Sequence, residues 1–254
     1  MNTTSMKSLT KKPAAVGIAS RQALSISDLQ AWYGESHILH GVNLAVNCGE
    51  VVTLLGRNGS GRTTTLRALM GLTGIRRGSI KINDVETIGM PTHKIAHLGV
   101  GYCPEERGIF SSLSAEENLL LPPSVSKIDK GMSIEEIYMM FPNLKERRSS
   151  QGTRLSGGEQ QMLAVARILR TGARLLLLDE ISEGLAPVIV KALASMITTL
   201  KASGYTIVMV EQNFCFAAPL ADRFYVMEHG QIVESFASSE LEAKTPTLRS
   251  LLGV

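Results

Sequence analysis

The residues best suited to chemistry lie in one short segment, 56–63, which reads GRNGSGRT. Its spacing follows the phosphate-binding pattern G-x-x-x-x-G-K-[ST], except that Arg62 stands at the lysine position. The glycines let backbone amides turn toward a phosphate, and the helix expected to follow adds its positive end. A glycine-rich turn without a ligand is the alternative interpretation. We expect this segment, called the P-loop below, to bind nucleotide through Gly56, Arg57, Asn58, Gly59, Ser60, Gly61, Arg62, Thr63 and Thr64.

Two acidic residues follow a strongly apolar run later in the chain. Four leucines, 175–178, precede Asp179 and Glu180, so both carboxylates are expected at the carboxyl end of a buried strand, where α/β sheets bind ligands. Asp179 and the hydroxyl of Thr63 are the predicted Mg²⁺ ligands, and Glu180 is the predicted group that orients or deprotonates the attacking water. The alternative is that the two acids only cap the next helix.

A third motif, LSGGEQQ at 155–161, stands before that strand and is called the signature segment below. Ser156 and the two following glycines are expected to open a helix with one apolar face. Taken alone, Ser-Gly-Gly is equally typical of an N-cap and a tight turn.

The elements that must position these motifs follow two patterns. Runs that are apolar throughout predict central strands of a parallel sheet covered on both faces, at 51–55, 175–178 and 207–210. Short runs separated by Gly and Asn predict an antiparallel β lobe, at 25–29, 42–46 and 80–82. The expected fold class is therefore α/β.

The stretch 107–158 is different, because it carries two capping boxes. Ser114 with Glu117 and Ser133 with Glu136 each match the pattern that begins a helix. We expect a helical subdomain inserted in the core, within one domain that spans 24–254. Residues 1–23 are predicted to form a flexible polar tail.

Composition excludes several classes of protein. The chain has 254 residues, 44% of them hydrophobic, and a net charge of +3, which is typical of a globular protein. Its basic residues form no block interleaved with aromatics, so a nucleic-acid partner is not expected. No apolar run approaches the roughly 20 residues that cross a bilayer. Three scattered cysteines indicate neither a disulfide framework nor a zinc site.

The P-loop, the signature segment and the Asp-Glu pair, in this order, resemble the ATP-binding cassette family from about residue 24 to the end of the chain. The resemblance implies a RecA-like P-loop NTPase core, an antiparallel β lobe and an inserted helical subdomain. It also implies that two cassettes pair head to tail, so that Ser156, Gly157, Gly158 and Glu159 contact the ATP held by a partner. Tyr33 matches the aromatic that stacks on adenine, and a core tyrosine at a strand end is the alternative.

Several variant positions resemble one branch of that family. Glu105 stands where a glutamine usually senses Mg²⁺ and the transmembrane partner, Gln212 replaces the histidine that reads the γ-phosphate, and Ile181 and Ala186 replace a proline and an aspartate. With the closing LLGV, these variants are similar to the smaller ATPase of branched-chain amino acid importers, a branch that includes urea and amide importers. The resemblance implies Glu105, Glu180 and Gln212 as catalytic residues. It places the chain at the cytoplasmic face of the inner (plasma) membrane, as a peripheral subunit.

The implied partners are two transmembrane permeases, a second ATPase subunit, identical or related, and a solute-binding protein that selects the solute. Arg62 departs even from this branch, because arginine is larger and planar and does not simply replace lysine. We expect ATP still to bind and hydrolysis at this site to be slow. The alternatives are a nucleotide-dependent dimerising scaffold, which Arg62 favours, and a soluble cassette of translation or DNA repair, which usually carries a second cassette or long coiled-coil insertions.

Overall fold

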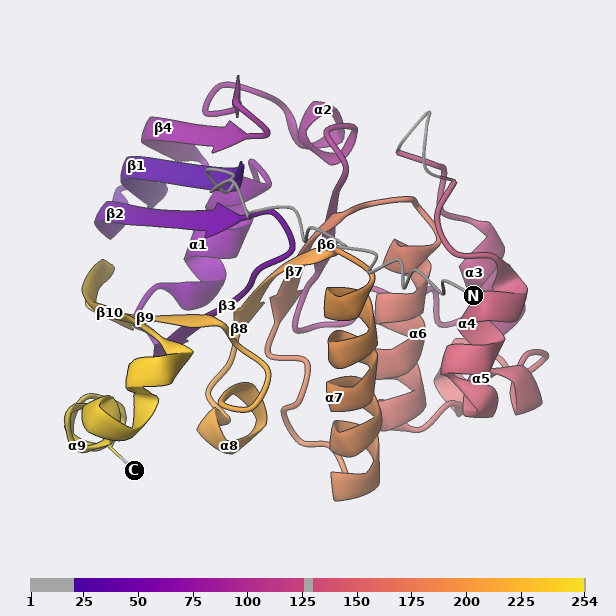
Figure 1. Ribbon diagram of the computed structural model, residues 1–254. Coiled ribbons are helices and arrows are strands. Elements are labelled where there is room, and N and C mark those ends of the chain that lie inside the picture. Colours follow the sequence, from indigo (N-terminus) through magenta and orange to yellow (C-terminus); the bar gives the residue numbers. More distant parts are fainter. Residues whose placement is uncertain (1–20, 126–129, 254) are drawn as a thin grey trace, which may run out of the picture.

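The computed structural model describes residues 21–125 and 130–253, arranged as two sheets with helices between and beside them (Figure 1). Most of the predicted tail lies outside the described residues. The first strand, β1, begins at Gln22, two residues before the predicted domain start at 24.

The smaller sheet is antiparallel, as predicted, with the order β2-β1-β4-β5. Strand β1 is longer than the predicted 25–29. A bulge shifts the alternation of buried and exposed residues, and the strand continues beyond it. Leu24 and Ile26 are buried on one side of the irregularity, Leu29 and Ala31 on the other, and Asp28 between them has φ 49°. The strands are β1 (Gln22–Tyr33), β2 (Ser36–Asn47), β4 (Ile75–Ile82) and β5 (Val85–Glu86).

The larger sheet has the order β10-β9-β3-β8-β7-β6, and only the edge strand β10 runs antiparallel to its neighbour. The three strands predicted as central, β3, β7 and β8, are buried along their whole length, as strands covered on both faces must be. The strands are β3 (Val51–Gly56), β6 (Val100–Cys103), β7 (Leu175–Asp179), β8 (Thr206–Val210), β9 (Arg223–Glu228) and β10 (Gln231–Ala237).

Parallel pairing brings the carboxyl ends of β3, β7 and β8 to one edge of this sheet. The P-loop follows β3, Asp179 ends β7, and Glu211 follows β8. Helix α1 (Arg62–Leu69) leaves the P-loop and buries Leu66 and Leu69 in the core between the two sheets.

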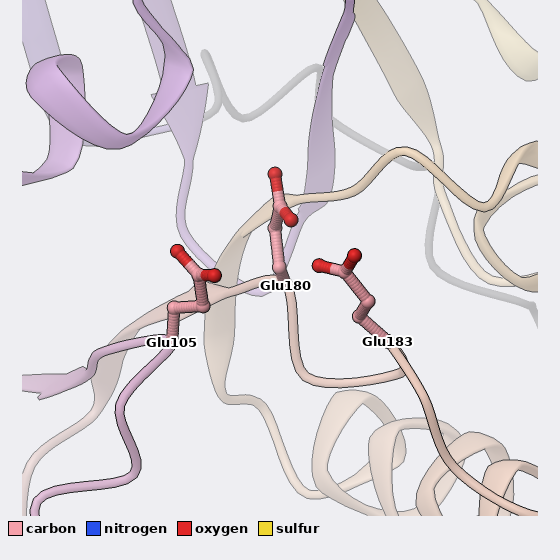
Figure 2. Close-up of side chains that lie close together, drawn as sticks. All are labelled: Glu105, Glu180 and Glu183. Atoms are coloured by element: carbon pink, nitrogen blue, oxygen red, sulfur yellow. The ribbon is translucent and has the colours of Figure 1, made fainter. Parts of the chain in front are cut away.

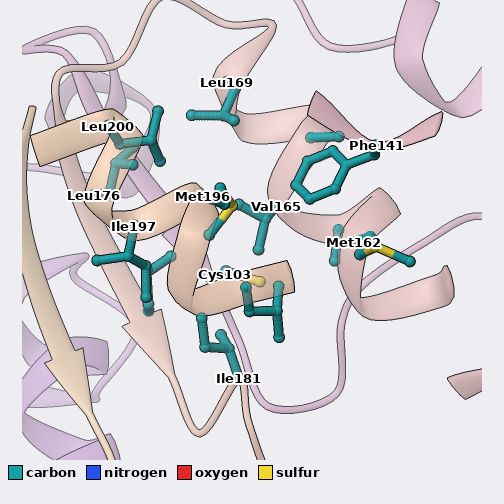
Figure 3. Packing of buried hydrophobic residues seen from close by; sticks show 14 of the residues in the cluster. Cys103, Phe141, Met162, Val165, Leu169, Leu176, Ile181, Met196, Ile197 and Leu200 are labelled. Carbon is teal, nitrogen blue, oxygen red and sulfur yellow. The ribbon is translucent and has the colours of Figure 1, made fainter. Parts of the chain in front are cut away.

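A second core lies on the other face of the parallel sheet. Helices α6 (Gly157–Leu169) and α7 (Pro187–Ala202) pack there against β7, and Figure 3 shows Val165, Met196 and Leu176 among the side chains that meet. Phe141, between α4 (Ile134–Met140) and α5 (Pro142–Glu146), extends the same cluster toward these two helices.

The helical region lies between β6 and β7, at the side of the molecule away from the antiparallel sheet (Figure 1). Both predicted capping boxes are present: the Ser114 and Ser133 hydroxyls accept from the amides of Glu117 and Glu136. The fold class predicted from the sequence is confirmed. The helices are α3 (Ala115–Leu120), α4 (Ile134–Met140), α5 (Pro142–Glu146) and the 3-10 turn η1 (Gly152–Arg154).

The C-terminal helix α9 (Leu241–Leu252) lies beside β9 and β10 and buries Leu248 against Leu55 and Phe224. Within 21–125 and 130–253, no helix is both long and apolar enough to span a bilayer. The remaining short elements are α2 (Thr92–Ala96), α8 (Phe214–Ala217) and the 3-10 turn η2 (Ser238–Glu240).

Candidate nucleotide site

The P-loop forms the tight turn that its glycines predict. Gly59 and Gly61 have φ 79° and 107°, which side chains with a Cβ rarely adopt. Gly56 is required by space instead, because a Cβ there would lie 2.6 Å from the carbonyl oxygen of Met227 and 2.5 Å from the Ser60 hydroxyl. This turn therefore requires glycine at positions 56, 59 and 61.

A cavity of about 440 Å³ opens over this turn. Most of the predicted P-loop residues line it, together with Tyr33, which is 39% exposed at the end of β1. The cavity is large enough for a nucleotide's phosphates. Glu105, Glu180 and Glu183 form its acidic side. The cavity is lined by Tyr33, Ile38, Asn58, Gly59, Ser60, Gly61, Arg62, Thr63, Thr64, Glu105, Glu180 and Glu183.

Arg57 does not line this cavity, although the sequence pattern placed it among the nucleotide-binding residues. Its guanidinium donates from Nε to the carbonyl of Leu251 at 2.9 Å and from Nη2 to that of Ser250 at 3.1 Å. These carbonyls end α9, where a cation is favourable. These two hydrogen bonds therefore join the P-loop to the C-terminal helix.

Arg62 points the other way, into the site. Its Nη2 donates to Glu180 Oε1 at 2.8 Å and to Asn58 Oδ1 at 3.2 Å. The pair is largely dry, because the side chains of Arg62 and Glu180 are 4% and 11% exposed. The charge that normally faces the phosphates is thus engaged with the predicted catalytic carboxylate.

The two predicted metal ligands lie together. The Thr63 hydroxyl donates to Asp179 Oδ1 at 3.0 Å, and the Tyr102 hydroxyl donates to Oδ2 at 3.0 Å. A hydroxyl beside a carboxylate is an all-oxygen donor set, which fits Mg²⁺. Burial raises the pKa of Asp179, while the bonds from Thr63 and Tyr102 oppose that rise. Tyr102 was not predicted from the sequence. Its position near the end of β6, the strand beside β7, could have indicated it.

Glu180 is held in an unusual backbone conformation, with φ 48°. Such a conformation persists only where the surroundings determine it, and here its amide donates to the Val210 carbonyl at 2.9 Å. Burial raises the pKa of Glu180 to about 7, the neighbouring acid Glu183 acts in the same direction, and Arg62 opposes both.

Figure 2 shows Glu105, from the loop after β6, close to Glu180 and Glu183, which share the turn after β7. Their carboxylate oxygens lie within 4.8 Å of one another. The sequence predicted the first two and missed Glu183, although its position three residues after Glu180, in the same turn, was a usable signal.

Gln212 is exposed and lines a neighbouring cavity of about 530 Å³ that shares Glu180 and Glu183 with the first. The buried residue beside it, Glu211, was not predicted. It accepts from the Ser182 hydroxyl at 2.7 Å and from the Ser182 amide at 3.2 Å. Burial raises the pKa of Glu211 to about 7. This contact ties the turn after β7 to the loop after β8.

The signature segment is built locally. The Ser156 hydroxyl accepts from the Glu159 amide at 3.3 Å, and the Ser156 amide donates to Glu159 Oε2 at 2.7 Å, which completes a capping box. Ser156 is exposed, whereas Gly158 is buried and a Cβ there would lie 2.7 Å from Ile189. None of Ser156, Gly157, Gly158 and Glu159 lines the cavity over the chain's own P-loop.

The family model described as ABC transporter matches residues 39–183. The chain is 42% identical over 211 residues to the high-affinity branched-chain amino acid transport ATP-binding protein BraG of Pseudomonas aeruginosa, covering 83% of this chain and 91% of that protein. It is 31% identical over 236 residues to the lipopolysaccharide export system ATP-binding protein LptB of Escherichia coli, covering 91% and 97%.

A solved structure has the same fold. It is the dimeric structure of a post-hydrolysis state of an ATP-binding cassette bound to ADP and phosphate, and it superposes with a TM-score of 0.72 at 22% identity, covering 85% of this chain and 98% of that one.

Proposed function

The chain belongs to the ABC transporter family, and from that membership we propose that it is the ATP-hydrolysing subunit of an importer for branched-chain amino acids or related small solutes. The observation that carries the proposal is the joined geometry of Thr63, Asp179 and Glu180 beside the P-loop cavity. A hydroxyl and two carboxylates beside a phosphate-binding turn suit hydrolysis of a nucleoside triphosphate.

Each residue then has a separate role. The P-loop amides and the start of α1 hold the phosphates, and Tyr33 stacks on the adenine from the cavity edge. Thr63 and Asp179 would hold Mg²⁺, which would supply positive charge to offset that of the phosphates. Glu180 orients the attacking water and accepts its proton, with Glu105 beside it.

The signature segment acts on a second ATPase subunit in this proposal. Ser156 is exposed and does not line the cavity of its own chain, so its contact with a γ-phosphate requires a partner cassette. Gln212 is exposed as well, and we propose that it lies at the same interface. We propose a head-to-tail pair of ATPases, identical or related, beneath two permeases at the cytoplasmic face of the membrane, with a solute-binding protein delivering the solute.

The solute class rests on similarity to BraG, and the similarity to LptB supports a lipid exporter as the second candidate. The experiment that separates them is reconstitution of the chain with the permeases encoded beside it. ATP hydrolysis stimulated by a loaded amino-acid-binding protein supports the importer, whereas stimulation by a lipopolysaccharide extrusion partner overturns it. Calorimetry on the neighbouring solute-binding protein identifies the solute.

Arg62 supports one further element of the proposal, that ATP binds and is hydrolysed slowly at this site. A dimerising scaffold that does not hydrolyse ATP is the alternative. Fluorescence titration of the purified chain tests binding, and absence of any ATP binding contradicts both versions. Turnover per site, measured for this chain with a partner whose own P-loop is disabled, separates slow hydrolysis from none.

A further inference from the structure

The Arg62 guanidinium is only partly satisfied by the described residues around it. Its Nη2 serves both Glu180 and Asn58, while Nη1 is buried and has no hydrogen-bond partner. A charged, buried donor without an acceptor is unfavourable, because the group has lost water and gained nothing in return. The guanidinium therefore retains capacity for a stronger acceptor than a single carboxylate oxygen.

The same guanidinium is placed to meet nucleotide phosphates. Arg62 lines the cavity together with Gly59, Gly61 and Thr64, whose amides belong to the phosphate cradle. Phosphate oxygens are strong acceptors that match the planar fork of arginine in a bidentate way. Because Nη1 is enclosed, a phosphate cannot bond to it while Nη2 stays on Glu180, so the fork must turn to bind phosphate with both of its ends.

We propose that Glu180 and the nucleotide phosphates compete for Arg62, so that Arg62 restrains the Glu180 carboxylate until nucleotide arrives and releases it. This inference rests on the ATPase function proposed above. It assigns to the arginine a task that its geometry suits: a lysine offers one ammonium at the end of a flexible stem, whereas Arg62 keeps a second nitrogen, Nη1, unpaired while Nη2 bonds Asn58 and Glu180. Catalysis by Glu180 is thereby linked to occupancy of the phosphate cradle.

If Glu180 and phosphate compete for Arg62, the effect of a Glu180 substitution on nucleotide affinity depends on whether Arg62 is present. We would measure binding of a fluorescent ADP analogue with Mg²⁺ to the native protein, Glu180→Gln, Arg62→Gln and the double variant. All variants are compared at one pH, pH 8. ADP avoids turnover, and light scattering verifies that each sample is monomeric. Glu183→Gln is the matched control, because it removes the same charge from the same cavity at a residue that makes no ion pair with Arg62 in the described part of the chain.

The expected result is that Glu180→Gln tightens ADP binding about tenfold when Arg62 is present and less than threefold in the Arg62→Gln background. Glu183→Gln is expected to tighten binding about twofold in both backgrounds, which measures simple charge repulsion. If circular dichroism shows that Arg62→Gln does not fold, Arg62→Met closes the same cycle.

Two results overturn the competition while leaving the ATPase proposal intact. Equal tightening by Glu180→Gln in both backgrounds means that the carboxylate only repels phosphate. Weaker binding by Glu180→Gln means that Arg62 bridges carboxylate and phosphate together. Failure of every variant and of the native protein to bind nucleotide overturns the proposed function along with the inference.

Discussion

The P-loop half of the site and the signature half are assembled in different ways. In the P-loop half, Arg62 reaches Glu180 across 118 positions of the chain and Thr63 reaches Asp179 across 116. In the signature half, Ser156 and Glu159 satisfy each other across three. The P-loop half therefore depends on how the parallel sheet brings strand ends together. The signature half depends only on the local structure at the start of α6.

This difference teaches where a substitution acts. A change in the P-loop half alters charges that were placed by distant strands, so it is felt in chemistry and in pH dependence. A change in the signature half alters a cap and an exposed surface, so we expect a small effect on the isolated chain and a large effect on the proposed pair of subunits.

The strongest test of the P-loop half is Glu180→Gln in the assembled transporter. If Glu180 is the base that activates water, as proposed above, its loss is expected to lower ATP turnover by about 10²- to 10⁴-fold. Steady-state phosphate release measures it, with Glu183→Gln as the control for the neighbouring carboxylate. Unchanged turnover would show that this half is idle and that a partner's site does the work.

The buried acid beside the site predicts a pH effect on stability. Burial raises the pKa of Glu211 from 4.5 to about 7, so the folded state favours the protonated form, and this stabilisation is complete below pH 4.5 and is lost as pH rises through 7. Relative to Glu211→Gln, the native protein is expected to lose about 3 kcal/mol of unfolding free energy between pH 4.5 and 8. Urea unfolding at both pH values measures it.

Removing a similar charge at an exposed position should leave this pH dependence of the unfolding free energy unchanged from that of the native protein. Glu106→Gln removes one negative charge from an exposed position and serves as that control. A difference between native protein and Glu211→Gln that stays constant across the pH range would contradict the assigned burial effect.

A matched pair of glycine substitutions sharpens the comparison between the halves. Gly56→Ala places a Cβ 2.6 Å from a backbone oxygen and is expected to cost about 1–3 kcal/mol of stability. Gly157→Ala meets its nearest atom, in the flexible Arg107 side chain, at 3.4 Å and is expected to change stability by about 0.5 kcal/mol or less. Thermal unfolding of both variants decides, and equal losses would mean that the two turns are equally crowded.

The smallest expected effects compare a local cap with a long-range one. Ser156→Ala removes the N-cap of α6 and is expected to cost about 1 kcal/mol. Arg57→Ala removes two donors from the end of α9 and is expected to cost about 0.5–1 kcal/mol, because Arg57 is exposed. Hydrogen exchange should place the first change in α6 and the second in α9. Faster exchange spread over the whole chain would contradict both assignments.

Much of the fold followed from local pattern. The buried runs ending at Leu55, Leu178 and Val210 became central strands, and the serines at 114 and 133 became helix caps. The length of β1 did not follow, because a bulge at Asp28 resets the alternation that marks a strand. The contacts of Arg57 did not follow either, because its acceptors lie in α9, 194 positions further along the chain for Leu251.

The sequence by itself determined which residue types form the P-loop turn, where the helices begin and which runs are buried, because glycine freedom, capping and burial act over a few neighbouring residues. Only the tertiary structure decided that Arg62 pairs with Glu180, that Tyr102 joins Asp179 and that Glu211 is sealed against Ser182. Those contacts depend on which strands lie side by side, and no local property of the chain encodes the distance between two strand ends.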